Sequence, residues 1–157
     1  MERNDYLKML VEEMHSTTMA TIGADGHPQT RVIDMMLWDE KGVYFLTAKG
    51  KAFYAQLMEQ GYVAISATKD KKAVSLRGRI QNIHSEKLDE IFEKNPYMQK
   101  IYPGDTRAAL EVFRVYEAEG EYFDITRIPA VIDQHQCLHC GRCAETCPRG
   151  TIRKRGQ

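Results

Sequence analysis

This sequence carries no sign of a disulfide framework, a membrane span or a strong net charge. The first 136 of its 157 residues contain no cysteine, so no disulfides can link distant parts of that region. No apolar run approaches the roughly 18 residues that a transmembrane helix needs. The 22 basic and 22 acidic residues cancel to a formal net charge of zero. This balance argues against binding nucleic acid or a membrane surface through bulk charge.

The N-terminal residues carry acidic side chains throughout and have no apolar segment of the kind found in signal peptides. We therefore expect a cytoplasmic protein. Hydrophobic residues make up 43% of the chain and charged residues 28%, as in ordinary globular proteins. A chain of 157 residues can bury a real core and is typical of one domain with, at most, a small appendage.

All four cysteines are crowded near the end of the sequence, at Cys137, Cys140, Cys143 and Cys147, with Pro148 next. This C-x2-C-x2-C-x3-C-P spacing is the bacterial ferredoxin pattern and predicts a 4Fe-4S cluster. Two-residue gaps let a tight loop direct three thiolates to three corners of one cluster. Zinc is the alternative occupant, although zinc sites usually separate two cysteine pairs by a dozen or more residues.

The fourth cluster ligand has two candidate sources, because in two-cluster ferredoxins the last cysteine of a run binds the other cluster. Cys147 either closes the cluster of its own chain or binds the cluster of a second copy in a homodimer. Residues 137–157 are too few to bury a core, so metal binding would supply their folding energy. We predict a domain over residues 1–126, a linker over 127–136 and an iron–sulfur segment over 137–157.

Patterns of apolar residues elsewhere predict a mainly β protein with flanking helices. Alternation and turn signals predict strands over 16–22, 30–38, 43–48, 62–68 and 73–84, then a closing hairpin of 111–119 and 121–125 around Gly120. Helical periodicity predicts helices over 5–15, 51–60 and 86–93. Several short strands at this spacing are typical of a sandwich or a barrel.

An anion site is predicted where the strand over 43–48 meets the following helix. Thr47, Lys49, Gly50 and Lys51 stand at that junction. Free backbone N–H groups and the helix dipole favour a phosphate there. Arg31, on a neighbouring strand, offers a planar bidentate donor to the same anion. The alternative is an ordinary lysine-rich surface turn.

Three short motifs follow one another along the chain: the run PQTRVID at 28–34, the run VYFLT at 43–47, and Lys49-Gly-Lys51 leading into a helix. Through these motifs, residues 16–84 resemble the pyridoxamine 5′-phosphate oxidase-like, FMN-binding split-barrel family. The resemblance implies a split β-barrel with flanking helices and a short C-terminal iron–sulfur segment. It also implies a homodimer that binds FMN at the subunit interface.

The family's cofactor-binding positions fall on two strands and on the turn after the second strand. By this resemblance, the phosphate ligands correspond to Arg31 and Lys51, with Thr47 and Lys49 beside them. The strand under the isoalloxazine ring corresponds to Val32, Ile33 and Asp34. Leu46 belongs to the same cofactor-binding set.

The cysteine run stands where the oxidases have a substrate segment rich in arginine and tryptophan, and Trp38 is the only tryptophan. We therefore expect an FMN oxidoreductase or electron-transfer protein that couples FMN to a 4Fe-4S cluster, not a true pyridoxamine phosphate oxidase. A small-molecule substrate and a ferredoxin-like redox partner fit this interpretation. The alternative is a non-enzymatic, dimeric binding or sensor module with a zinc or iron–sulfur tail. The sequence predicts no particular catalytic residue.

Overall fold

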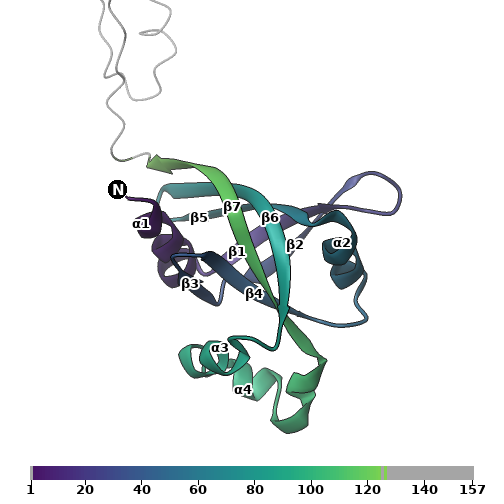
Figure 1. The fold of residues 1–157 in the computed structure, drawn as a ribbon. Helices are drawn as coiled ribbons and strands as arrows, with labels where there is room; N and C mark the ends of the chain where they lie inside the picture. The colour runs from purple at the N-terminus through teal and green to yellow at the C-terminus, as the bar shows by residue number, and fades with distance from the viewer. Residues whose placement is uncertain (1, 125, 127–157) are drawn as a thin grey trace, which may run out of the picture. The chain divides into compact units, whose positions relative to one another are not determined.

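The computed structural model describes residues 2–124 and 126 (Figure 1). One compact unit spans Met1–Phe123. The predicted linker and the four predicted cluster ligands lie outside the described residues. Within the described part of the chain, no helix has both the length and the apolar character needed to cross a membrane.

The described chain forms a seven-stranded sheet in the order β2-β1-β5-β6-β7-β4-β3 (Figure 1). The strands are β1 (Ser16–Ile22), β2 (Pro28–Asp34), β3 (Leu37–Asp39), β4 (Gly42–Ala48), β5 (Tyr62–Lys69), β6 (Lys72–His84) and β7 (Leu110–Asp124). The pairs β1–β2, β1–β5, β3–β4, β4–β7 and β5–β6 are antiparallel. This mainly antiparallel sheet with flanking helices confirms the predicted fold class.

The helical segments cover the ends and faces of the sheet (Figure 1). They are α1 (Arg3–Lys8), the π-helix η1 (Met9–Met14), α2 (Ala52–Gln60), α3 (Leu88–Lys94), α4 (Met98–Ile101) and the 3₁₀-helix η2 (Gly104–Ala109). α2 joins β4 to β5, so it directly follows the predicted anion-binding turn.

Strand β4 is buried almost along its whole length because it separates two apolar cores. Val43 and Phe45 belong to the larger core, which includes side chains of η1 and α2. Tyr44 and Leu46 belong to a smaller core that includes side chains of α3 and α4. Alternate residues of a strand point to opposite faces, so a strand between two cores has a continuous apolar sequence.

The helix predicted over 5–15 is present but changes type along its length. α1 gives way to η1, where the His15 N–H donates to the Leu10 carbonyl at 2.9 Å. η1 buries Met9, Leu10 and Val11 in succession. An α-helix, with 3.6 residues per turn, does not place three successive residues on one narrow stripe. The sequence pattern, which was read for that period, therefore predicted a helix without revealing the π-helix.

The single strand predicted over 30–38 is wrong, because β2 and β3 are separate strands. The two residues between them have different backbone partners. The Met35 N–H donates to the His15 carbonyl and the Met36 N–H donates to the Tyr44 carbonyl, each at 2.8 Å. The chain therefore leaves the β1 side of the sheet and joins β4 at this point.

The hairpin predicted around Gly120 is also wrong, since β7 continues through this residue. A Cβ atom on Gly120 would lie 2.3 Å from the Ser75 carbonyl oxygen of β6. β6 and β7 are neighbours in the sheet. The glycine thus permits a close approach of two strands, and the sequence signal was mistaken for a turn.

Candidate functional site

Arg31 extends from β2 toward α2 and is the centre of a small polar cluster, called here the Arg31 cluster. Its Nη1 donates to Thr21 Oγ1 at 2.5 Å, and its Nη2 donates to Gln56 Oε1 at 3.1 Å. The guanidinium carbon lies 4.3 Å from the centre of the Phe53 ring. Burial lowers the pKa of Arg31, but a guanidinium stays charged at any working pH. A fixed positive charge therefore lies beside α2.

Hydrogen-bond donors remain for a ligand beside Arg31 and at the start of α2. A guanidinium has five N–H groups, and the contacts with Thr21 and Gln56 use only some of them. Lys51 is the N-cap of α2 and makes no side-chain capping hydrogen bond. The N–H groups of the first helical turn are therefore open to an anion. A fixed guanidinium and an open helix start fit the phosphate of FMN.

Lys49 has a different partner, Glu111. Together with the other side chains that contact the Glu111 carboxylate, Tyr54, Asn82 and His84, these residues are called here the Glu111 cluster. Lys49 Nζ lies 3.5 Å from Oε1 of Glu111 on β7, whose side chain is only 11% exposed. Tyr54 and Asn82 donate to Oε2 of Glu111 at 2.5 and 2.6 Å. His84 Nδ1 lies 3.3 Å from Oε1. Both oxygens of this carboxylate are therefore already engaged.

The Glu111 carboxylate is strongly stabilised in its charged form. Hydrogen bonds from Tyr54 and Asn82 lower the pKa of Glu111 to about 2, against the opposing effect of burial. The hydrogen bond to Glu111 in turn raises the pKa of Tyr54. Sequence analysis named Lys49 but missed the rest of this cluster, because its other members come from α2, β6 and β7 and no short motif connects them.

The three residues after Arg31 have different surroundings. Val32 is 70% exposed, whereas Ile33 packs against the larger core. Asp34 accepts hydrogen bonds from Ser16 Oγ at 2.6 Å and from the Tyr97 hydroxyl at 2.9 Å. Val32 therefore presents an open apolar surface next to Arg31 along β2.

The two predicted positions at the end of β4 are buried. Leu46 belongs to the smaller core, and Thr47 is opposite Glu111 in the β4–β7 register. The structure thus brings Arg31 and Lys51 to the same helix, while Lys49 lies with Glu111.

Comparison with models of known protein families shows which family this chain belongs to. The family model for pyridoxamine 5′-phosphate oxidase matches residues 4–124, which is most of the chain. The chain belongs to this family. A model for a 4Fe-4S binding domain matches residues 129–152, a range that contains all four cysteines. These matches confirm both parts of the resemblance drawn from the sequence.

Curated relatives of this family member are named pyridoxine/pyridoxamine 5′-phosphate oxidase. One from Paracidovorax citrulli is 29% identical over 93 residues, which cover 58% of this chain and 41% of the relative. Another, from Gloeothece citriformis, is 25% identical over 137 residues, which cover 85% of this chain and 60% of the relative. The chain thus spans about half the length of the curated relatives it matches.

A solved structure supports the fold. A NimC/NimA family protein from Clostridium acetobutylicum superimposes with a TM-score of 0.68 and 21% sequence identity. The superposition covers 78% of this chain and 88% of that protein. At this identity the likeness shows the split-barrel fold alone.

Proposed function

We propose that this protein is a cytoplasmic, homodimeric redox protein that binds FMN in its barrel and a 4Fe-4S cluster through its four cysteines. Electrons pass between the two cofactors and a small-molecule substrate or a ferredoxin-like partner. The observation that supports this most strongly is the combination of a flavin-type barrel family with a 4Fe-4S motif in one chain. Flavin supplies two-electron chemistry, and the cluster carries one electron at a time.

The barrel residues bind and orient the flavin in this proposal. Arg31 and the first turn of α2 would donate to the phosphate, and Lys51 would add a second positive charge. The exposed Val32 side chain would offer the ring an apolar surface. Lys49 stays with Glu111 and holds the turn before α2 in place.

Anaerobic purification of the full chain tests the proposal. The protein should be brown-yellow, release FMN on denaturation, and contain iron and acid-labile sulfide. Reduction of the flavin should be followed by bleaching of the cluster absorbance if electrons pass between them. A colourless protein with stoichiometric zinc contradicts the proposal and favours a non-enzymatic binding or sensor module.

The Cys140→Ser variant tests whether the two cofactors bind independently of each other. This variant should lose iron and sulfide but keep FMN, because a serine does not replace a thiolate ligand. Ala144→Ser is the matched control, since it changes a position inside the motif that is not a ligand. Loss of FMN together with iron in Cys140→Ser contradicts independent binding of the two cofactors.

A further inference from the structure

Asp34, the last residue of β2, carries a negative charge that the proposed function does not use. Its side chain is partly buried, with 29% exposed. Ser16 Oγ donates to Oδ1 at 2.6 Å, and the Tyr97 hydroxyl donates to Oδ2 at 2.9 Å. His15 Nε2 lies 3.5 Å from Oδ2. Among residues 2–124 and 126, no lysine or arginine forms an ion pair with this carboxylate.

The two hydroxyl groups hold the Asp34 carboxylate without cancelling its charge. Burial and the hydrogen bond to Asp34 raise the pKa of Tyr97 above its ordinary value. Tyr97 is therefore a neutral donor at any working pH, as is Ser16. The Tyr97 ring also packs edge-on against the His15 ring, with 5.9 Å between their centroids. The three neighbours thus fix the position of a charge that they leave in place.

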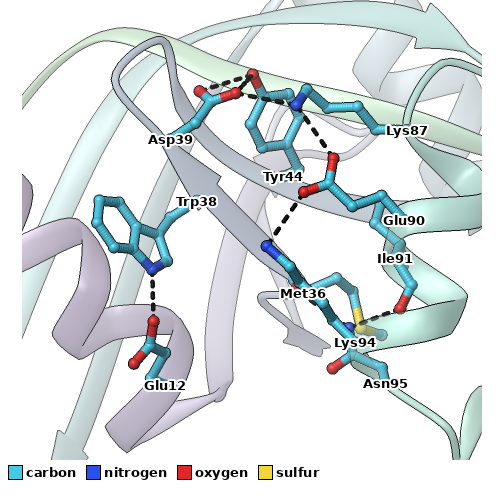
Figure 2. Close-up of polar contacts among 10 residues, drawn as sticks. All are labelled: Glu12, Met36, Trp38, Asp39, Tyr44, Lys87, Glu90, Ile91, Lys94 and Asn95. Carbon is cyan, nitrogen blue, oxygen red and sulfur yellow. Dashed lines mark hydrogen bonds and ion pairs between the residues drawn. The ribbon is translucent and has the colours of Figure 1, made fainter.

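The chain directly after Asp34 is tied to the rest of the protein as well. The Met35 N–H donates to the His15 carbonyl at 2.8 Å. Asn95 Nδ2 donates to the Met36 carbonyl at 2.9 Å (Figure 2). A charge held on both its side chain and its backbone keeps its orientation when a second charge develops nearby.

Asp34 lies on the same face of β2 as Val32. Side chains alternate along a strand, and Ile33 between them packs against the larger core. Val32 is 70% exposed on the opposite face, the one that the proposed function assigns to the flavin ring. Two positions along a strand are about 7 Å apart. The Asp34 carboxylate therefore stands beside the surface that would receive the ring.

We propose that the Asp34 carboxylate lowers the reduction potential of bound FMN by disfavouring its reduced form. This inference rests on the proposed function. At pH 8 the isoalloxazine ring takes up two electrons and one proton from solution, so it gains one negative charge. A ferredoxin-like partner would supply the electrons one at a time. A fixed negative charge at short range repels the charge that the ring gains. The lower potential makes the reduced flavin a stronger donor to a 4Fe-4S cluster.

The affinities for the two forms of FMN measure this effect. Full-length protein is dialysed to equilibrium at pH 8 without oxygen, against oxidised FMN and against dithionite-reduced FMN. The flavin on each side is then measured by absorbance after reoxidation. Asp34→Asn keeps the shape of the side chain and removes its charge. The ratio of the Kd for reduced FMN to the Kd for oxidised FMN should fall roughly tenfold in this variant. A tenfold change corresponds to about 30 mV for a two-electron couple.

Three further variants separate charge from structure. Asp34→Thr removes the charge with a residue that suits a strand, and should change the ratio as Asp34→Asn does. Asp34→Glu keeps the charge and should keep most of the wild-type ratio. Asp25→Asn is the matched control, because Asp25 is an exposed carboxylate in the turn at the far end of β2. The length of β2 places it roughly 20 Å or more from Asp34, so the ratio should not change. Circular dichroism verifies folding.

The outcomes distinguish this inference from the proposed function. A wild-type protein that binds neither form of FMN contradicts both. A protein that binds FMN but shows the wild-type ratio in whichever of Asp34→Asn and Asp34→Thr folds overturns the inference alone. The inference is also overturned if Asp34→Glu or Asp25→Asn changes the ratio as much as Asp34→Asn does.

Discussion

Helix α2 contributes to two polar clusters of opposite design. In the Arg31 cluster, Gln56 and Phe53 of α2 surround a cation that keeps N–H donors to spare. In the Glu111 cluster, Tyr54 of α2 donates to a carboxylate whose two oxygens are both engaged. Spare donors around a fixed charge indicate a ligand site, whereas a satisfied buried charge indicates a structural role.

This contrast predicts different consequences when the central group is removed. Loss of the Glu111 carboxylate should weaken the fold, because it leaves buried donors without an acceptor. Loss of the Arg31 guanidinium should weaken flavin binding, because it removes donors that a phosphate would use.

The largest effect is expected for Glu111→Ala. Tyr54 and Asn82 lose their common acceptor, so the free energy of unfolding should fall by about 3 kcal/mol. Urea denaturation of the full chain measures this change. Glu119→Ala is the matched control, because Glu119 pairs with Arg77 on the exposed surface. The control should cost less than about 1 kcal/mol. Equal losses in the two variants would show that the Glu111 cluster has no special structural role.

Arg31→Ala should weaken FMN binding by about 1.5–3 kcal/mol, which is roughly tenfold to hundredfold in Kd. Quenching of FMN fluorescence in a titration of the flavin-free protein measures the affinity. Arg79→Ala is the control, because Arg79 pairs with Glu117 on the exposed surface of β6. Arg31→Lys keeps the charge but not the planar donor pair, and should fall between the wild type and Arg31→Ala. Unchanged affinity in Arg31→Ala refutes its role as a phosphate ligand.

The Glu111 cluster should also determine part of the pH dependence of stability. The folded state holds the pKa of Glu111 at about 2, below its ordinary value of 4.5. The charged carboxylate therefore stabilises the protein above pH 4.5, and this contribution is lost as the pH falls from 4.5 toward 2. Glu111→Gln should lose less stability than the wild type across that range. Urea denaturation at several pH values measures both curves, and parallel curves would contradict the assignment.

Lys49→Ala should have the smallest effect. Its ammonium is about half exposed and already paired with Glu111, so FMN affinity and stability should each change by less than about 1 kcal/mol. Lys51→Ala provides the comparison, and it should weaken FMN binding more than Lys49→Ala does. The reverse order would show that Lys49 leaves Glu111 to bind the phosphate.

Much of the sheet was predictable because its strands carry local signals. In β6, buried Val74 and Ile80 alternate with exposed Ser75, Arg77 and Arg79, as the sequence pattern indicates. A helix start with nearby cations is also a short-range feature, so the sequence predicts the turn before α2 and Arg31 as a phosphate site. The structure places Arg31 beside α2, and the phosphate role of these residues stays a prediction.

Apart from the local π-helix η1, the features that sequence analysis missed depend on contacts between distant segments. Gly120 was assigned to a turn because its close approach to Ser75 is visible only in three dimensions. Glu111 meets Asn82 and Tyr54 across two strands and a helix, a relationship that no spacing encodes. The contact of His15 with Tyr97 spans 82 positions in the sequence.

If Arg31 and the start of α2 bind the flavin phosphate, FMN must bind more tightly than riboflavin, which has the same ring and ribityl chain without the phosphate. Parallel fluorescence titrations of the wild type and Arg31→Ala with both flavins measure this directly. We expect the wild type to prefer FMN by roughly tenfold or more, and Arg31→Ala to lose most of that preference. Equal affinities of the wild type for FMN and riboflavin would contradict the assignment of this site.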